Sequence, residues 1–497
     1  MIRHRIKTNQ IIIVLGLFCF IPFTTLSAQD KSEQIDQLVQ SYTDIHEFNG
    51  TVLVAKKGKI LLQRGYGFAN IELGVHNTID TKFRIASLTK QFTAMLIMQL
   101  KQSGKLSLND PISTFLPYFR KHVGDRVTIH QLLTHTSGIR DYINRADFFP
   151  DIAVHNYSPD EFVEKFCSDS LQYEPGTRYQ YCNSEYYILG AIIEAITKKP
   201  YAEVLKEKIF DVIGMKNSGI DFPDKILQNR ANGYNYNYGN YTNADYINMS
   251  SSIYAAGGIY STVGDLLLWD DALYGEKLLS KENKDTMFTP FINKYAYGIV
   301  VNKTSISGIN HEVTLMVHTG GINGFRSIML REIEDKEIII LLSNSVLNNN
   351  FDIDLNPISN RIFSILNGLP YENPKPSIGS AVGEKVYNGT VEKAVSFFHQ
   401  AKLQAKEKYD FTNLESELNT LGYSLLSKQR SKDAVAIFKL NTEEFPKSWN
   451  AFDSYGEALM KDGQKEAAIE NYRLSLSLNP DNTNAIEQIK ILEVKKK

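Results

Sequence analysis

The sequence predicts an α+β fold with one antiparallel sheet, followed by a separate all-α helical repeat domain. Residues 51–63 have the pattern of two short apolar strands joined by a Lys57-Gly58 turn, and residues 297–342 contain four more strand patterns. The pattern from 88 to 290 is mostly helical. Strands from both ends of this segment are therefore expected to share one sheet, with the helical region inserted between them.

The first 28 residues have the composition of a secretory signal peptide. Arg3, Arg5 and Lys7 precede an apolar run from Ile11 to Phe23, and Leu26-Ser27-Ala28 fits a cleavage site. The apolar run is too short for a comfortable membrane span, so an uncleaved anchor is the minor alternative. We expect an exported protein, periplasmic or secreted, with no membrane span after cleavage.

Composition excludes some classes of partner. The formal net charge is −2, and no basic cluster precedes the terminal Lys495-Lys496-Lys497, so no nucleic-acid partner is expected. Two cysteines remain after cleavage, Cys167 and Cys182; they could pair in an oxidising compartment, and buried free thiols are the alternative. No Cys/His spacing resembles a metal site, and no metal or cofactor is expected.

The strands predicted for the sheet form two groups, one on each side of the helical region. They are 51–55 and 59–63 in the first group, and 297–301, 313–318, 326–331 and 336–342 in the second, where Glu334-Asp335 joins the last two.

A serine and a lysine three residues apart begin the first helical pattern. Ser87 and Lys90 would lie on one face, nearly one turn apart, so the amine can reach the hydroxyl. A desolvated lysine can lose its proton and activate a serine, and the free N–H groups of a helix start can stabilise an oxyanion. The alternative is a capping serine and a solvated lysine. The apolar residues that would form one buried stripe are Leu88, Phe92, Met95, Leu96 and Leu100.

Two further motifs carry groups that could act beside Ser87. Tyr181-x-Asn183 follows the Pro175-Gly176 turn and precedes a helical run from Tyr186 to Ile196, so a phenol and an amide could flank the serine.

The second motif, His318-Thr319-Gly320-Gly321, ends a predicted strand, where the Gly321 N–H could serve as an oxyanion donor. The alternative is a glycine-rich turn with a partly buried histidine.

Together these motifs resemble the penicillin-recognising serine hydrolase family of class C β-lactamases, D-alanyl-D-alanine peptidases and related esterases, over roughly residues 36–365. The accessory segments Thr128–Gly138 and Ala255–Thr262 agree with it. The resemblance implies a β-lactamase-like antiparallel sheet with a helical insertion. It also implies that Ser87 is acylated and that Lys90 is its base. The remaining roles that it implies are catalysis by Tyr181 and substrate binding by Asn183, His318, Thr319, Gly320 and Gly321.

His318 stands where the family often has lysine. An imidazole with an unperturbed pKa of about 6.5 would be mostly neutral at pH 7.5 and would charge towards pH 6. Preference for an anionic substrate is therefore expected to rise as the pH falls. Family members with histidine here include esterases and peptidases, which favours those activities over strong β-lactam recognition.

The C-terminal segment has a tetratricopeptide-like period. Gly422, Ala434, Phe438 and Pro446 are each followed 34 residues later by a similar residue, namely Gly456, Ala468, Tyr472 and Pro480. The expected division is a signal peptide (1–28), a hydrolase domain (29–367), a linker (368–385) and TPR-like repeats (386–497). The repeats are expected either to bind a protein partner or only to pack on the enzyme.

The leading hypothesis is an exported serine hydrolase that forms an acyl-enzyme with a small-molecule or peptide substrate, an amide or ester such as a β-lactam, a D-amino-acid peptide or an ester. The alternative is a ligand-binding or sensor protein that acylates without turnover and signals through the TPR-like repeats. The tyrosine-rich stretch Tyr234–Tyr246 is expected to be a surface loop packed on the domain, or else to line the cleft.

Overall fold

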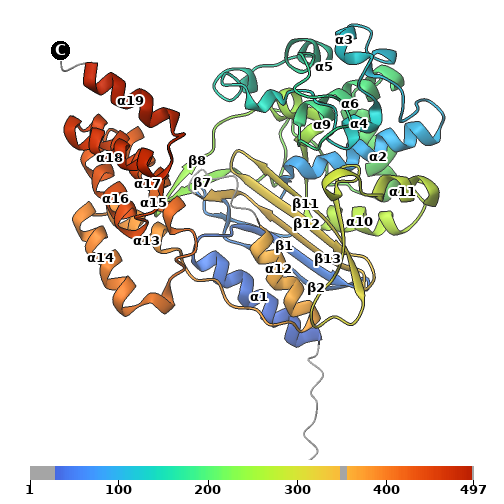
Figure 1. Cartoon of the computed structure of the whole chain (residues 1–497). Helices are drawn as coiled ribbons and strands as arrows, with labels where there is room; N and C mark the ends of the chain where they lie inside the picture. The colour runs from blue at the N-terminus through green and yellow to red at the C-terminus, as the bar shows by residue number, and fades with distance from the viewer. Residues whose placement is uncertain (1–27, 348–354, 495–497) are drawn as a thin grey trace, which may run out of the picture.

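The computed structural model describes residues 28–347 and 355–494 (Figure 1). The predicted signal peptide lies outside the described residues, except for Ala28, where helix α1 begins. None of the described helices is long and apolar enough to cross a membrane.

One six-stranded antiparallel sheet forms the centre of the N-terminal part, with the strand order β10-β11-β12-β13-β1-β2. Its strands are β1 (Gly50–Lys56), β2 (Lys59–Tyr66), β10 (Val300–Ser305), β11 (Glu312–Ile322), β12 (Phe325–Glu332) and β13 (Glu337–Ser343). Strand β1 pairs with β13, which confirms that both ends of the segment share one sheet.

Strand β10 begins three residues later than predicted, at Val300. Gly298 has φ +77°, and a Cβ there would lie 2.7 Å from the Lys90 carbonyl oxygen. The chain at Tyr297-Gly298 therefore crosses close over helix α2, and the strand can begin only after that crossing.

The sheet is covered on both faces (Figure 1). Helices α1 (Ala28–Asp44) and α12 (Asn356–Asn367) pack on one face around Val52, Ile339 and Ile362. The inserted region packs on the other face in a separate core that includes Phe92 and Trp269. The motif residues lie on this second face.

The inserted region is mostly helical, as predicted, and also contains short strands. Its main helices are α2 (Thr89–Gln102), α3 (Lys121–Gly124), α4 (Ile129–Leu133), α5 (Pro159–Phe162), α6 (Asn183–Thr197), α7 (Tyr201–Leu205), α8 (Asp211–Ile213), α9 (Tyr254–Gly257), α10 (Val263–Tyr274) and α11 (Lys281–Phe288). Its short strands are β6 (Gly219–Ile220), β7 (Tyr234–Asn237), β8 (Asn240–Asn243) and β9 (Ile259–Ser261). Outside this region, β3 (Phe68–Asn70), β4 (Val75–His76) and β5 (Phe83–Arg84) precede it, and β14 (Ser345–Leu347) follows β13.

The C-terminal part is an array of antiparallel helices. They are α13 (Ile378–Tyr387), α14 (Val391–Gln404), α15 (Leu414–Ser427), α16 (Ser431–Glu444), α17 (Trp449–Lys461), α18 (Lys465–Leu478) and α19 (Thr483–Val494). Helix α13 occupies the second half of the segment 368–385 that was expected to be a linker, so the non-helical connection after α12 is shorter than predicted. Its apolar residues Ile378, Val382 and Val386 are buried in the core of the array, which explains why the helix forms there.

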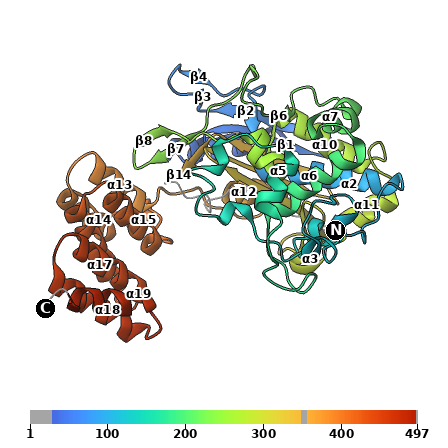
Figure 2. The same cartoon turned by 90° about the horizontal axis from the view of Figure 1, so that it is seen from above.

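The tyrosine-rich stretch forms the hairpin β7–β8, which extends to the helical array (Figure 2). At its tip, Tyr238 is 3% exposed and is buried among residues of α13 to α15. The stretch is therefore a bridge between the two parts of the molecule, whereas the sequence predicted a loop packed on its own domain.

Candidate active site

Ser87 and Lys90 lie at the start of helix α2, within reach of each other. Ser87 is in the single 3-10 turn Ala86–Leu88 that leads into α2, and it is partly exposed. The Lys90 Nζ donates to Ser87 Oγ at 3.1 Å and to the Ala256 carbonyl at 2.8 Å. The structure thus brings the predicted nucleophile and base together.

Helix α2 is buried more completely than one apolar stripe predicts. Every residue from Thr89 to Met98 is buried, and Lys90 has no exposed surface. Burial lowers the pKa of Lys90 to about 7, although the nearby Asp141 opposes the shift. The solvated-lysine alternative is therefore wrong, and a large fraction of Lys90 is neutral near pH 7.

Tyr181 and Asn183 both contact this lysine. The Lys90 Nζ lies 4.8 Å from the centre of the Tyr181 ring and donates to Asn183 Oδ1 at 2.8 Å. Burial raises the pKa of Tyr181, an effect that the neighbouring Ser87 hydroxyl partly offsets. The Tyr181 hydroxyl is buried and has no other polar contact of good geometry among the described residues.

Asn183, the first residue of α6, is held from both sides. Its Nδ2 donates to Asp141 Oδ2 at 2.9 Å, while its Oδ1 accepts from Lys90. Asp141 had no signal in the sequence, because it lies 42 residues from Asn183 and no motif includes it. It orients the amide so that the oxygen faces the lysine.

The Gly320-Gly321 segment lies within strand β11, beside the turn that carries Ser87. A Cβ on Gly320 would lie 2.5 Å from the Ile85 carbonyl oxygen and 3.1 Å from Ala86 Cβ, so only glycine allows this approach. Gly321 is exposed, with nothing within 4 Å of the position that a Cβ would take. The strand edge next to Ser87 is therefore open to a substrate.

His318 is buried and neutral. Its Nδ1–H donates to the Thr319 carbonyl at 2.6 Å, and its Nε2 accepts from the Tyr295 hydroxyl at 3.1 Å. Burial and the nearby Lys90 lower the pKa of His318 to about 4. The expectation that this ring charges between pH 7.5 and pH 6 is therefore wrong, because Lys90 and the lack of water both oppose the imidazolium.

The two cysteines are free and buried, and Cys182 stands between Tyr181 and Asn183 in the chain. Among the described residues no group of histidine, cysteine and acidic side chains could hold a metal ion.

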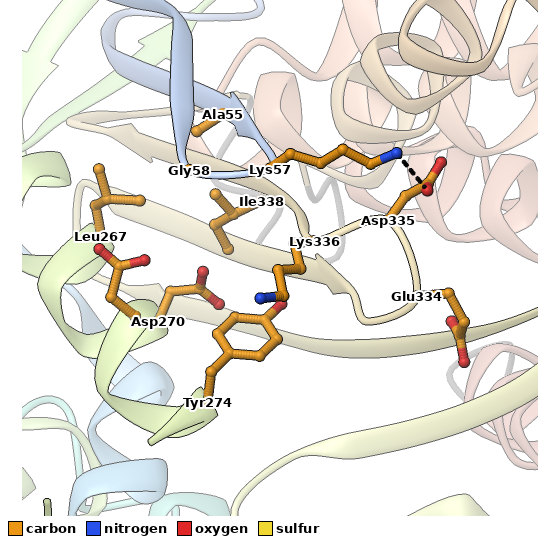
Figure 3. A pocket seen from close by; sticks show the side chains of 11 residues that line it. Ala55, Lys57, Gly58, Leu267, Asp270, Tyr274, Glu334, Asp335, Lys336 and Ile338 are labelled. Atoms are coloured by element: carbon orange, nitrogen blue, oxygen red, sulfur yellow. Dashed lines mark ion pairs between the residues drawn. The ribbon is translucent and has the colours of Figure 1, made fainter.

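Two cavities lie outside this polar cluster. One, of about 550 Å³, is at the far end of the sheet and is lined by Lys57, Asp270, Tyr274 and Lys336 among others (Figure 3). The other, of about 260 Å³, is nearer to Ser87. Its walls include Arg84 of β5, Phe325 of β12 and residues 243–246, which begin at the last residue of β8. The tyrosine-rich stretch thus also lines a cavity near the site.

Known proteins resemble this chain over the N-terminal part. A model of the beta-lactamase family matches residues 35–359. The putative penicillin-binding protein PbpX of Bacillus subtilis strain 168 is 31% identical over 347 residues, which cover 69% of this chain and 82% of that protein. The teichoic acid D-alanine hydrolase of Staphylococcus aureus strain MRSA252 is 29% identical over 331 residues, which cover 65% of this chain and 76% of that protein.

A solved structure has the same fold. The penicillin binding protein from Bacillus halodurans superposes with a TM-score of 0.56 at 26% identity, covering 66% of this chain and 98% of that one. The helices from α13 onward lie outside the range that the family model matches.

Proposed function

We propose that this chain, which belongs to the beta-lactamase family, is an exported serine hydrolase that forms an acyl-enzyme at Ser87 with an amide or ester substrate. The observation that carries the proposal is the buried Lys90 amine 3.1 Å from Ser87 Oγ. A base must be within hydrogen-bond reach of the proton that it takes and must be unprotonated near the working pH, which for a lysine means neutral.

The proposed reaction has two halves. Neutral Lys90 takes the Ser87 proton while Oγ attacks the substrate carbonyl, and the N–H groups of Ser87 and Gly321 stabilise the oxyanion. The C–N or C–O bond then breaks. The proton passes from Lys90 to the leaving group, with the Tyr181 hydroxyl as the relay between them. Water hydrolyses the acyl ester in the second half and frees Ser87.

The neutral His318 points to the substrate class. A buried imidazole that is hydrogen-bonded at both nitrogens gives no positive charge to a substrate carboxylate, in contrast to a lysine at this position. We therefore favour esters and amides of D-amino acids without a carboxylate next to the scissile bond. One relative is a teichoic acid D-alanine hydrolase, and a D-alanyl ester is such a substrate.

Mass spectrometry after incubation with D-alanyl esters, D-amino-acid amides and penicillins tests the proposal. An acyl adduct on the peptide that contains Ser87 is expected, and Ser87→Ala should lose both the adduct and hydrolysis. Ser103→Ala is the matched control, since Ser103 is exposed just after the same helix. An adduct on another serine, or unchanged hydrolysis by Ser87→Ala, would contradict the assignment.

A sensor that acylates without turnover is the second candidate. The hairpin β7–β8 favours it, because its tip is buried in the helical array while residues 243–246 line the cavity near Arg84. Turnover separates the two functions: a hydrolase releases many product molecules per Ser87, and a sensor releases at most one.

A further inference from the structure

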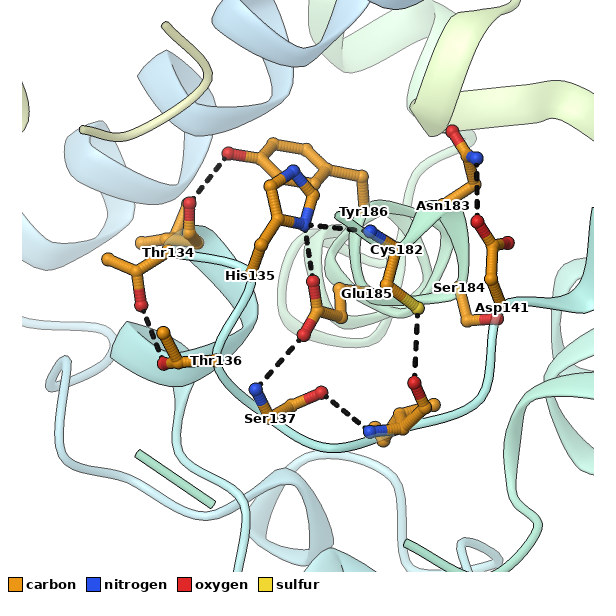
Figure 4. Close-up of polar contacts among 12 residues, drawn as sticks. Thr134, His135, Thr136, Ser137, Asp141, Cys182, Asn183, Ser184, Glu185 and Tyr186 are labelled. Atoms are coloured by element: carbon orange, nitrogen blue, oxygen red, sulfur yellow. Dashed lines mark hydrogen bonds and ion pairs between the residues drawn. The ribbon is translucent and has the colours of Figure 1, made fainter. Parts of the chain in front are cut away.

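A buried histidine, His135, and a buried glutamate, Glu185, lie in contact (Figure 4). His135 follows helix α4, Glu185 is in the first turn of α6, and neither has exposed surface. His135 Nδ1 contacts Glu185 Oε2. The second glutamate oxygen accepts from the Ser137 N–H at 3.1 Å, so the carboxyl group is held at both ends.

Two groups, the Glu185 carboxyl group and the Cys182 N–H, contact His135 Nδ1. The Cys182 N–H is directed at Nδ1 at 3.3 Å, and His135 Nε2 is buried with no hydrogen-bond partner among the described residues. When Glu185 holds the proton of this contact and donates it to Nδ1, both side chains are neutral. Burial raises the pKa of Glu185 and lowers that of His135, and Lys90 lowers the latter further. Both directions agree with a neutral pair.

The pair holds the segment that carries the site. The His135 ring lies 4.4 Å from the Tyr181 ring, and its Nδ1 fixes the backbone of Cys182, the residue between Tyr181 and Asn183. His135 itself has φ +56°, which places its ring against Tyr181 at the expense of backbone strain. Strain of this kind persists only where the surroundings hold it in place.

We propose that His135 and Glu185 are positioning residues for acylation: as a neutral pair they fix Tyr181 and Asn183, and they leave the Lys90 amine free to accept the Ser87 proton. The inference rests on the proposed function of Ser87. An ionised Glu185 would favour the charged form of Lys90, so the protonated carboxyl group matters as much as the contact. The titratable groups that face the pair are Lys90 from α2, Asp141, Tyr179, Tyr181, Cys182, Tyr186 from α6, Tyr295 and His318.

Glu185→Gln tests the neutral pair. A glutamine amide can donate to Nδ1 and accept from Ser137 as the protonated acid does, so the acylation rate should stay within about threefold of the parent. The pH at which acylation is half-maximal should not move. A larger loss, or a shifted pH profile, would overturn the neutral pair and indicate an ion pair.

His135→Asn tests positioning, because asparagine tolerates positive φ but cannot place a ring against Tyr181. We expect acylation to fall by at least about tenfold with the KM changed much less, since misplacing a catalytic group lowers the rate of the chemical step. His130→Asn is the matched control: His130 is on α4 and hydrogen-bonds Tyr297, away from Tyr181. A loss no greater than in the control would overturn the role of His135.

Folding and the parent enzyme are checked in the same experiments. Both variants should keep a Tm close to that of His130→Asn; if His135→Asn does not fold, the pH profile of Glu185→Gln still decides the question. Absence of a Ser87 adduct in the parent would contradict the proposed function. If the parent acylates and His135→Asn behaves like the control, only the role of the pair is contradicted.

Discussion

At the scale of single residues, the burial of Lys90 sets the pH dependence expected of the proposed reaction. The pKa of about 7 means that the neutral base predominates above pH 7. Below it the protonated amine cannot accept the Ser87 proton, so acylation should fall about tenfold per pH unit.

This prediction can be checked by measuring acylation by a neutral ester between about pH 5.5 and 9. Lys90→Arg, which stays charged over the whole range, should not acylate at any pH while remaining folded. A rate that is flat down to the acid end would show that no such base is titrating.

His318 leads to a second prediction. Because the pKa of His318 is lowered to about 4, the ring stays neutral from pH 8 down to pH 6. It therefore adds no positive charge that could attract an anionic substrate over that range. The ratio of kcat/KM for an anionic ester to that for a neutral ester of similar shape should therefore be flat over about pH 6–8. A ratio that rises towards pH 6 would show that the ring does charge in this range.

The motif spacing predicted which residues surround Ser87, and it could not predict their protonation. Ser87 and Lys90 are three residues apart, and Tyr181 and Asn183 are two apart, so each pair can be recognised in the sequence as a short motif. The state of His318 depends on Tyr295 and Lys90, which reach it only through the tertiary fold. His135 and Glu185 are 50 residues apart and have no local signal as a pair.

At the scale of elements, an aromatic ring packs directly over each of the two repeat glycines, so these positions have little room for a side chain. A Cβ on Gly422 would lie 2.4 Å from the Phe438 ring, whereas one on Gly456 would lie 3.0 Å from the Tyr472 ring. The 34-residue spacing matches Gly422 to Gly456 and Phe438 to Tyr472, and it says nothing about the distance between glycine and ring. It did not predict that the first is tighter, because helix crossing distances are set by all the side chains of the pair.

This difference predicts the outcome of two matched substitutions. Alanine favours a helix by about 1 kcal/mol over glycine, and overpacking opposes it by about 1–3 kcal/mol. Gly422→Ala should therefore destabilise the helical array, and Gly456→Ala should have little net effect. Thermal unfolding followed by helix circular dichroism is the measurement; equal Tm values for the two variants would contradict the packing argument.

At the scale of the whole molecule, the aromatic ring that covers the first helix of the array comes from the hydrolase part. Gly383 of α13 is covered by Tyr238, and a Cβ there would lie 2.1 Å from that ring. Tyr387 stacks on Tyr238 with ring centres 5.5 Å apart, and Glu384 accepts from the Tyr236 hydroxyl at 2.8 Å. The sequence could not reveal this contact, because the partners are about 145 residues apart and each also fits a local pattern of its own.

The hairpin tip allows the effect of this ring to be separated from that of the turn. Tyr238 and Gly239 have φ +48° and +87°, as in a two-residue turn that favours asparagine at its first position. Tyr238→Asn should therefore keep the hairpin but remove the buried ring. The free energy that holds the hairpin tip against α13 should fall by about 3 kcal/mol, because the ring is almost completely buried there.

Hydrogen exchange of the full-length chain measures that loss where it occurs. Amides of α13 should exchange roughly 100-fold faster in Tyr238→Asn than in the parent, because opening of the contact becomes that much more frequent. Amides of α17, which do not touch the hairpin, should change little and serve as the internal reference. Tyr246→Asn is the matched control, since Tyr246 is 53% exposed in the same segment. If α13 exchanges no faster in Tyr238→Asn than in this control, the ring does not hold the array to the enzyme.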